Sequence, residues 1–339
     1  MSMAPLTRKL KIFAWVAASV CGSAALVAGA EPPAPQAAIT SLAGSLAAVS
    51  AGSASDAWAV GQTRTHKTLA LHWNGTSWAQ VPTPAPGAFG SLLSGVTEIS
   101  PTNVWAVGSS NTSSGGAGLV LHWNGAKWAQ VPTPSAGISG LSGVSAVSAT
   151  DIWAVGSGGT TTRETTLVLH WDGKAWTQVS SPNPGATDNQ LLGVHMTSAT
   201  DGWAVGLTTN SLAQDLTLVL HWDGTAWTQV PSPSFGLSNG GSQLAAVSAL
   251  TGSDAWASGL VFTNGGGEGT LLLHWNGMAW TRVAAPSPSP GGATGGSFLN
   301  GVAMVATADV WSAGGTFFDS TGREQTLLLH WNGMAWTRF

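Results

Sequence analysis

The chain has 339 residues, including 45 glycines and 19 tryptophans, and charged residues make up only 8% of it. With 11 Lys and Arg against 15 Asp and Glu, the formal net charge is −4, which lacks the basic footprint of a nucleic-acid-binding protein. A single cysteine excludes a disulfide framework and a cysteine-based zinc site.

The N-terminus has the layout of a secretory signal peptide. Three basic residues at positions 8, 9 and 11 precede an apolar stretch over 12–27, and the small residues Ala28, Gly29 and Ala30 follow. A membrane anchor is the alternative, but Gly22 interrupts a run that is already short for a span. We therefore expect a signal peptide over 1–30, cleaved after about Ala30, and a secreted, extracellular protein with no membrane span.

Cleavage would change the chemistry of the mature chain. The only cysteine, Cys21, lies in the signal segment, and because Val20 rather than a small residue precedes it, lipoprotein anchoring is not favoured. Removing three of the 11 basic residues leaves eight against 15 acids, a net charge of −7. A weakly charged surface rich in Ser, Thr, Asn and Gly suits neutral ligands. A Pro/Ala-rich linker is expected over 31–41.

The rest of the chain, 42–339, is an internal repeat of about 50 residues. The phrase Leu-His-Trp-(Asn/Asp)-Gly-x-x-Trp occurs six times, and an (Asp/Asn)-x-Trp-(Ala/Ser) motif precedes each copy. Three tryptophans per unit account for all but one of the 19, the other being Trp15 in the signal segment. The repeated histidines are His72, His122, His170, His221, His274 and His330.

Each unit is predicted to form four short strands, which in the third unit are 141–148, 152–156, 166–171 and 176–179. The third strand alternates with period two, so that Trp171 shares a face with the leucines and His170 takes the other face. Asp172-Gly173 is a tight hairpin turn that brings Trp171 beside Trp176. A Pro-rich segment then ends the unit.

Six such units and no helical period predict an all-β fold, a six-bladed β-propeller with four antiparallel strands per blade. Each buried tryptophan removes about 150–250 Å² from water, so these residues are expected to form the core. The chain stops within the last strand of the sixth unit. A truncated seven-bladed propeller therefore remains an alternative. We expect the protein to be a monomer.

The connections between second and third strands vary most between units and carry much of the charge outside the repeated acidic positions. These second-to-third-strand loops and the connections between blades emerge on one face of a propeller, which is the expected recognition face. The candidate ligand-binding residues in these loops are Arg64, Lys67, Arg163 and Arg323.

The motifs resemble known repeats. Asp151-Ile152-Trp153-Ala154-Val155-Gly156 followed by Leu169-His170-Trp171-Asp172-Gly173-Lys174-Ala175-Trp176 resembles the Trp-rich propeller repeats of exported bacterial proteins, grouped with kelch, galactose-oxidase-like or Asp-box propellers. The part from Trp171 to Trp176 is also similar to the repeat of six-bladed fucose-binding lectins. In those lectins, an Arg and a Glu in the preceding strands hold the sugar, and 167–170 contains neither residue.

The repeated polar residues favour a structural role. One His per blade, away from the axis, does not converge on a metal, whereas a hydrogen bond from His170 to Asp151 within the blade is expected. This resembles the Asp–His–Trp network of WD-type propellers. One acid per blade offers too few oxygens for calcium, so no cofactor or metal is expected. The residues predicted to be structural are Asp56, Trp58, His72, Trp73, Trp78, Asp151, Trp153, His170, Trp171 and Trp176.

Two departures from the repeat occur in first strands, where we expect side chains to face the central channel. Unit two has Glu98 and unit four has His195 at positions that are mostly small in the other units. Together they suggest ligand binding or acid–base chemistry, while the simpler interpretation is that a wide, wet channel tolerates polar residues.

The function favoured is a non-enzymatic module that binds a protein or a neutral surface ligand through the variable loops. The complete absence of tyrosine excludes galactose-oxidase and sialidase chemistry. Two alternatives stay open: a glycan-binding lectin with sites repeated between blades, and a hydrolase or lyase that uses Glu98 and His195.

Overall fold

The computed structural model describes residues 43–113, 115–134, 137–160, 163–263, 267–288, 295–318 and 323–339, together with the backbone of a two-residue strand, β1 (Ala17–Ala18). The predicted signal peptide and linker, 1–41, lie outside the described residues apart from β1. Among the residues described, no helix is both long enough and apolar enough to cross a membrane.

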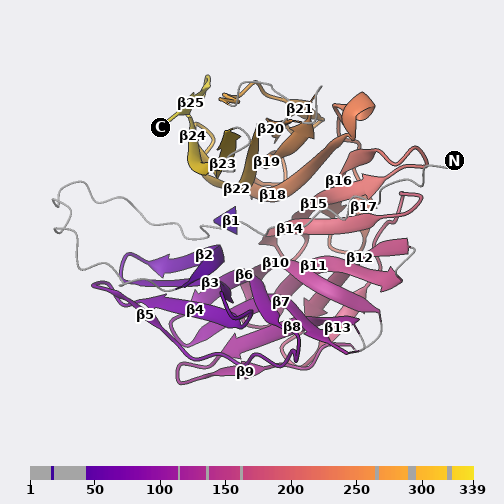
Figure 1. The fold of residues 1–339 in the computed structure, drawn as a ribbon. Helices are drawn as coiled ribbons and strands as arrows, with labels where there is room; N and C mark the ends of the chain where they lie inside the picture. The colour runs from indigo at the N-terminus through magenta and orange to yellow at the C-terminus, as the bar shows by residue number, and fades with distance from the viewer. Residues whose placement is uncertain are drawn as a thin grey trace, which may run out of the picture.

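Six four-stranded units follow one another along the chain and form the blades of the propeller (Figure 1). Blade one contains β2 (Gly44–Ser53), β3 (Asp56–Thr63), β4 (Thr68–Trp73) and β5 (Trp78–Gln80), and blade two contains β6 (Ser91–Ser100), β7 (Asn103–Thr112), β8 (Gly115–Trp123) and β9 (Trp128–Gln130). Blade three contains β10 (Ile138–Ser148), β11 (Asp151–Thr160), β12 (Arg163–Trp171) and β13 (Trp176–Val179), and blade four contains β14 (Asn189–Ser198), β15 (Asp201–Thr209), β16 (Asp215–Trp222) and β17 (Trp227–Gln229). Blade five contains β18 (Ser242–Thr251), β19 (Asp254–Phe262), β20 (Glu268–Trp275) and β21 (Trp280–Arg282), and blade six contains β22 (Gly296–Ala306), β23 (Asp309–Phe318), β24 (Arg323–Trp331) and β25 (Trp336–Arg338).

Every blade is an antiparallel meander in which each strand pairs with the next along the chain. In blade three the register places Val144 opposite Ala154, Ala154 opposite Leu169, and Leu169 opposite Gln178. The first strand of each blade carries two irregularities in register, and that of blade three carries a third; they bend and twist the strand. The predicted six-bladed, four-stranded propeller is confirmed.

The second and third strands are longer than their sequence pattern predicted. In blade three, β11 continues to Thr160 and β12 begins at Arg163, so the ladder runs through most of the segment expected to be a loop. Small and polar residues on these extensions obscure the period-two signal. The described part of the variable region is therefore a projecting pair of strands.

The hydrophobic core lies between the blades. We call each interface between neighbouring blades a seam. The second-strand tryptophan of one blade packs against the third- and fourth-strand tryptophans of the next: the ring centroid of Trp153 lies 4.7 Å from that of Trp222 and 5.6 Å from that of Trp227. The same arrangement occurs in five seams, from blades one and two to blades five and six. Each blade thus completes the core of its neighbour.

The axis of the propeller is nearly filled. Small residues of the first strands enclose a cavity of only about 50 Å³ there, with apolar side chains such as Val144 and Val247 in its wall. At Gly193 a Cβ atom would lie 2.9 Å from the carbonyl oxygen of Ala245, so only glycine permits this approach of neighbouring blades. This corrects the expectation of a wide, wet channel, because first strands with glycine or alanine at the axis pack directly on one another.

Candidate binding site on the loop face

The repeated histidines are bound inside their own blades. In blade three, His170 Nε2 lies 2.8 Å from Asp151 Oδ1, the indole N–H of Trp153 donates to the same oxygen at 2.9 Å, and the His170 and Trp153 rings stack. Four further Asp–His pairs have N–O distances of 2.7–2.9 Å. Among the described residues, no group of three or more His, Cys, Asp or Glu is arranged to hold a metal ion.

Blade two differs at this position. Asn103 replaces the aspartate, accepting from the indole of Trp105 and bonding His122 at 2.9 Å. Burial lowers the pKa of His122 below its usual value. A neutral amide therefore suffices to hold a neutral imidazole, which agrees with a structural role.

Glu98 lies between blades one and two. Its Oε2 accepts a hydrogen bond from the backbone N–H of Gly52 at 3.1 Å, and its own backbone N–H donates to the hydroxyl of Ser50. Burial, followed by the negative charge of Asp56, raises the pKa of Glu98 to about 7. Glu98 is thus part of a seam, and it is not among the residues that line the axial cavity.

His195 lies at a different seam, between blades four and five. Its ring forms a hydrogen bond with the backbone of Ala249, and burial lowers its pKa to about 4. It too is absent from the lining of the axial cavity. The expectation that Glu98 and His195 face one channel is corrected, because each is engaged with a neighbouring blade.

The basic residues predicted to bind a ligand lie on three different blades. Arg64 and Lys67 are exposed on the projecting hairpin of blade one, and Arg163 is exposed at the start of β12 in blade three. Arg323 begins β24 in blade six, and its side chain lies outside the description. None of the four lines the pocket described below.

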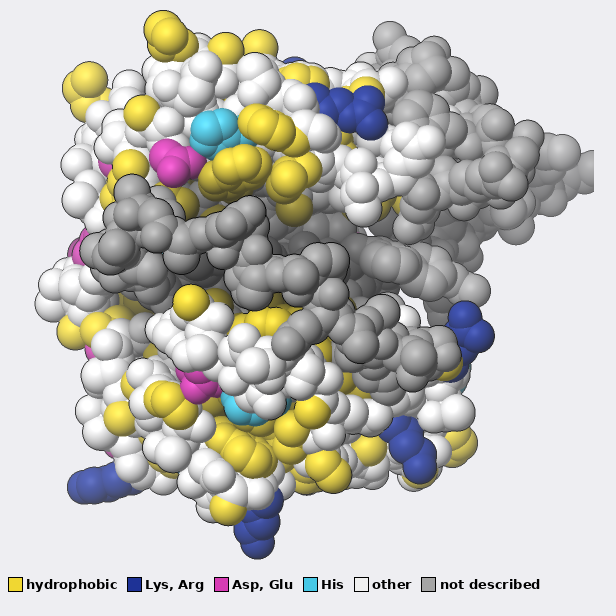
Figure 2. Space-filling view, turned by 90° about the vertical axis from the view of Figure 1, so that its left-hand side faces the viewer, with side chains coloured by type: hydrophobic (Ala, Val, Ile, Leu, Met, Phe, Trp, Pro, Cys, Tyr) yellow, Lys and Arg dark blue, Asp and Glu magenta, His cyan; other side chains and the backbone are white. Residues whose placement is uncertain are grey.

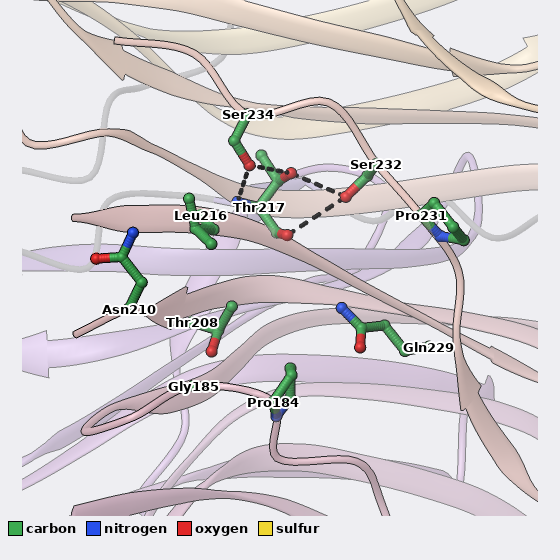
Figure 3. Close-up of a pocket in the computed structure, with 10 residues that line it drawn as sticks. All are labelled: Pro184, Gly185, Thr208, Asn210, Leu216, Thr217, Gln229, Pro231, Ser232 and Ser234. Atoms are coloured by element: carbon green, nitrogen blue, oxygen red, sulfur yellow. Dashed lines mark hydrogen bonds between the residues drawn. The ribbon is translucent and has the colours of Figure 1, made fainter. Parts of the chain in front are cut away.

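That pocket, of about 380 Å³, opens beside blade four on the face predicted for recognition (Figure 3). The segment linking blades three and four forms one side, and the second to fourth strands of blade four and the segment that follows its fourth strand form the rest. All its polar side chains are uncharged. The lining residues are Pro184, Gly185, Thr208, Asn210, Leu216, Thr217, Gln229, Pro231, Ser232 and Ser234.

Hydrogen bonds fix most of the pocket wall. Thr217 bonds the hydroxyls of Ser232 and Ser234 at 2.8 and 3.2 Å, as the dashed lines in Figure 3 show. The buried Asn189 accepts from Gly185 N–H and from the Thr208 hydroxyl at 2.7 and 2.9 Å. Gly185 cannot be replaced without disturbance, since a Cβ atom there would meet the Thr208 hydroxyl at 2.1 Å.

Gln229 is the adaptable group in this wall. Its side chain is exposed, and Figure 3 shows the amide turned toward the middle of the pocket. An amide offers both a donor and an acceptor. A ligand in the pocket therefore meets preformed hydroxyl walls and one polar side chain that is able to adjust.

The hairpin of blade four is a rigid rim beside the pocket. Asn210 Oδ1 accepts from the backbone N–H groups of Leu212 and Gln214, and Gln214 in turn donates to the Leu237 carbonyl of the next connection. Ala213 has φ of 58°, an unusual conformation for a residue with a Cβ atom. Leu212 at this tip is 75% exposed, so the rim presents an apolar side chain to solvent.

Three acidic residues surround the pocket without lining it. Burial is the main cause that raises the pKa values of Glu164 and Asp215, and the charge of Asp188 adds to the effect in both. Glu164 accepts from Gln190, and Asp215 accepts from Thr209 at 2.9 Å. The negative potential of this group disfavours anionic ligands.

Blade five differs from blade four at two of the pocket positions. Phe235 stands at the place of Pro184, and Arg282 at the place of Gln229, with the guanidinium carbon 4.8 Å from the centre of the phenyl ring. This cation–π pair occupies the position that is open beside blade four. Sequence reasoning missed the pocket because Pro184 and Gln229 belong to no motif. A comparison of the repeats could have found it: blade five has Phe235 and Arg282 at these two positions, and the repeat before it has neither an aromatic residue nor an arginine there.

Comparison with known proteins gives the fold and no family. No protein-family model and no curated protein sequence matches the chain. Among solved structures, YCF48 bound to D1 peptide is 15% identical with a TM-score of 0.52, and the alignment covers 88% of this chain and 81% of the other. A protein of unknown function from Dyadobacter fermentans is 12% identical with a TM-score of 0.52, covering 80% of this chain and 90% of the other.

A third structure, a six-bladed fucose-binding lectin from Aleuria aurantia, is 14% identical, covering 84% of this chain and 89% of the lectin. Its TM-score is 0.49. At such identities the likeness concerns architecture alone. The chain is a Trp-rich β-propeller.

Proposed function

We propose that the protein is a secreted, non-enzymatic binding module that takes an uncharged ligand on its loop face, at the pocket beside blade four. The observation that carries the proposal is this pocket, whose hydroxyl walls are fixed by hydrogen bonds while the Gln229 amide is free to reach a ligand. The acidic surroundings and the mature charge of −7 disfavour an anionic ligand.

The alternatives receive less support from the geometry. A lectin with a site at every seam is disfavoured, since Phe235 and Arg282 fill the equivalent place in blade five. An enzyme that uses Glu98 and His195 is disfavoured because these residues belong to blades two and four, each bound to a different neighbour.

Binding to arrays of neutral oligosaccharides and of uncharged peptides tests the proposal. We expect the protein to bind at least one member, and the double variant Pro184→Phe, Gln229→Arg, which copies the blade-five pair, to bind it at least about tenfold more weakly, a loss of about 1.4 kcal/mol.

Gln80→Arg is the matched control, since it makes the same change at the corresponding position of blade one, where the side chain is also exposed. It should bind like the unaltered protein. The proposal fails if neither array captures the protein, or if the double variant binds as well as the control.

A further inference from the structure

The hydroxyl groups of the pocket wall use their protons inside the wall. Thr208 donates to Asn189 Oδ1 at 2.9 Å. Thr217 Oγ1 and Ser232 Oγ lie 2.8 Å apart, so one of them donates to the other. The hydroxyl that accepts this bond donates in turn to a carbonyl oxygen, that of Pro233 at 3.2 Å from Thr217 or that of Thr217 at 3.3 Å from Ser232. Since a hydroxyl has one proton and two lone pairs, lone pairs are what remains for a ligand.

Ser234 and Asn210 are the other fixed polar side chains of the wall. Ser234 Oγ accepts from the backbone N–H of Thr217 at 3.0 Å, and the Thr217 hydroxyl, at 3.2 Å, can accept its proton. The Asn210 amide donates to Gln214 Oε1 at 2.8 Å and keeps one further N–H. A ligand group that matches this wall therefore donates more hydrogen bonds than it accepts. The hydroxyl oxygens with lone pairs to offer are those of Thr208, Ser232 and Ser234.

The charges around the pocket also favour a donor. The negative charge of Asp188 acts on both Glu164 and Asp215, so three acidic groups lie near one another here. On the side of the molecule shown in Figure 2, by contrast, the acidic side chains stand apart from one another. A negative potential stabilises N–H groups and disfavours a carboxylate. Since none of the three acids lines the pocket, an ammonium group there would lose water without gaining a paired carboxylate.

The pocket lies beside the free edge of a strand. β17 is the last strand of its sheet and, among the described strands, pairs with β16 alone. The N–H of Val230, directly after β17, donates to the carbonyl oxygen of Val219 in β16. Because bonded and non-bonded pairs alternate along an antiparallel ladder, the backbone groups of Gln229 point away from β16. An extended peptide can pair with this edge and place one of its side chains beside Gln229.

We propose that the pocket binds the side chain of a glutamine in an uncharged, extended peptide that pairs with the edge of β17. The amide nitrogen of that glutamine donates two hydrogen bonds to the hydroxyl wall, whereas a sugar hydroxyl has one proton and brings two lone pairs. Its amide oxygen accepts from the Gln229 amide, and its methylene groups lie against Pro184, Leu216 and Pro231. The inference rests on the function proposed above and names the class of ligand.

A series of peptide probes tests the inference. The probes are acetyl-Ser-Thr-X-Thr-Ser-amide, in which X is Gln, Glu, Met, Lys or N,N-dimethylglutamine, and their binding to the full chain is measured by calorimetry at pH 7. Met keeps the length of Gln without a polar head, and dimethylglutamine keeps the acceptor without a donor. We expect the Gln probe to bind at least about tenfold more tightly than each of the others.

Methylation of single backbone nitrogens tests the pairing with β17. Alternate residues of an added strand turn their N–H groups toward the edge and away from it. Methylation of X and methylation of the threonine that follows it should therefore differ: one should weaken the Gln probe by about tenfold, and the other should have little effect. Equal effects of the two changes would contradict strand pairing.

Ser232→Ala tests the hydroxyl wall, because it removes an acceptor from the pocket. It should weaken binding of the Gln probe by about tenfold. Ser181→Ala is the matched control: Ser181 Oγ lies 2.7 Å from Thr166 Oγ1 in the same motif of blade three and does not line the pocket. The control should bind the Gln probe like the unaltered protein.

The inference is wrong if the Met or dimethylglutamine probe binds as well as the Gln probe, if the Glu or Lys probe binds more tightly, or if Ser232→Ala has no effect. It is also wrong if no probe binds. If a ligand from the arrays is then still lost in the double variant Pro184→Phe, Gln229→Arg, the pocket is a binding site and only the ligand class is wrong. If the double variant keeps every ligand, the function proposed above fails as well.

Discussion

At the scale of single residues, Glu98 shows how one substitution within a repeat creates a titrating group. The equivalent residues of other blades include Ala51, Ala146 and Met196, all without charge. In blade two, a carboxyl group instead lies beside Asp56 and against the Gly52 amide. Burial and a neighbouring carboxylate both favour the protonated form.

The raised pKa predicts a pH-dependent stability. The folded protein keeps the Glu98 proton up to about pH 7, while the unfolded chain releases it near the ordinary glutamate pKa of 4.5. The folded state thus binds more protons in this window, and stability falls as the pH rises through it. Glu98→Gln should remove the loss, making the variant more stable than the parent at pH 8. The gain should be about 1 kcal/mol, well below the full equivalent of the pKa shift, because solvent screens a half-exposed carboxyl group.

Urea unfolding at pH 4 and pH 8 measures this effect. At pH 4 the two proteins should have similar free energies of unfolding, because Glu98 is protonated or nearly so in both states of the parent. A parent protein that gains stability relative to the variant between pH 5 and pH 8 would contradict the assignment.

Residue-scale features were the least predictable from sequence. Glu98 and His195 stood out as departures from the repeat, but the sequence did not reveal that they contact a neighbouring blade instead of the channel. Likewise, the period-two pattern placed Trp171 beside Trp176, whose ring centroids lie 5.9 Å apart. It did not reveal that Trp153 packs on the following blade, since contacts between repeats leave no mark on the periodicity within one repeat.

At the scale of elements, the hairpin between third and fourth strands is fixed by its turn chemistry. Gly173 has φ of 91°, and the Asp172 carboxylate accepts from the backbone N–H groups of Lys174 and Ala175 at 2.8 and 2.9 Å. The equivalent glycines of the other five blades have φ between 88° and 90°. These turns were predictable because Asn-Gly and Asp-Gly satisfy a local backbone requirement.

Gly173→Ala should destabilise the protein by about 1–2 kcal/mol, because alanine resists positive φ. Its Cβ atom would also lie 2.7 Å from Thr150 Cγ2. Lys174→Ala, an exposed change in the same turn, is the control and should stay within about 0.5 kcal/mol of the parent. Equal thermal stability of both variants would show that the turn does not constrain the hairpin.

The projecting hairpins were predictable as variable segments but not as strands. Their tips contain residues with weak strand preference, and the ladder that extends β11 to Thr160 depends on backbone pairing with β12. The pocket beside blade four was equally hidden, because it arises where the blade-four wall meets the segment after blade three. The position of the pocket depends on how neighbouring blades are placed next to one another, and the sequence of a single repeat does not contain this information.

At the scale of the whole molecule, stability is a sum over neighbouring blades. Five seams are packed, and blades one and six each have one face without a partner blade among the described residues. The inner blades are held on both sides. Local opening should therefore begin at the two ends of the arc.

Hydrogen exchange of the full chain checks this expectation. Amides of β4 and β24 should exchange at least about tenfold faster than those of β12 and β16, which occupy the same place in blades three and four. Uniform protection of all four strands would contradict an open arc in the intact chain and indicate that all blades open together.

The sharing of each core cluster between two blades has a consequence for synthesis. Trp153 finds its tryptophan partners in Trp222 and Trp227, about 70 residues further along the chain. A blade that has just emerged from the ribosome or from a translocation pore consequently shows an apolar face until the next repeat arrives. The nascent chain therefore exposes such an apolar face on its most recently completed blade at every stage of its growth. A chaperone that shields one blade-sized surface would serve all six repeats in turn.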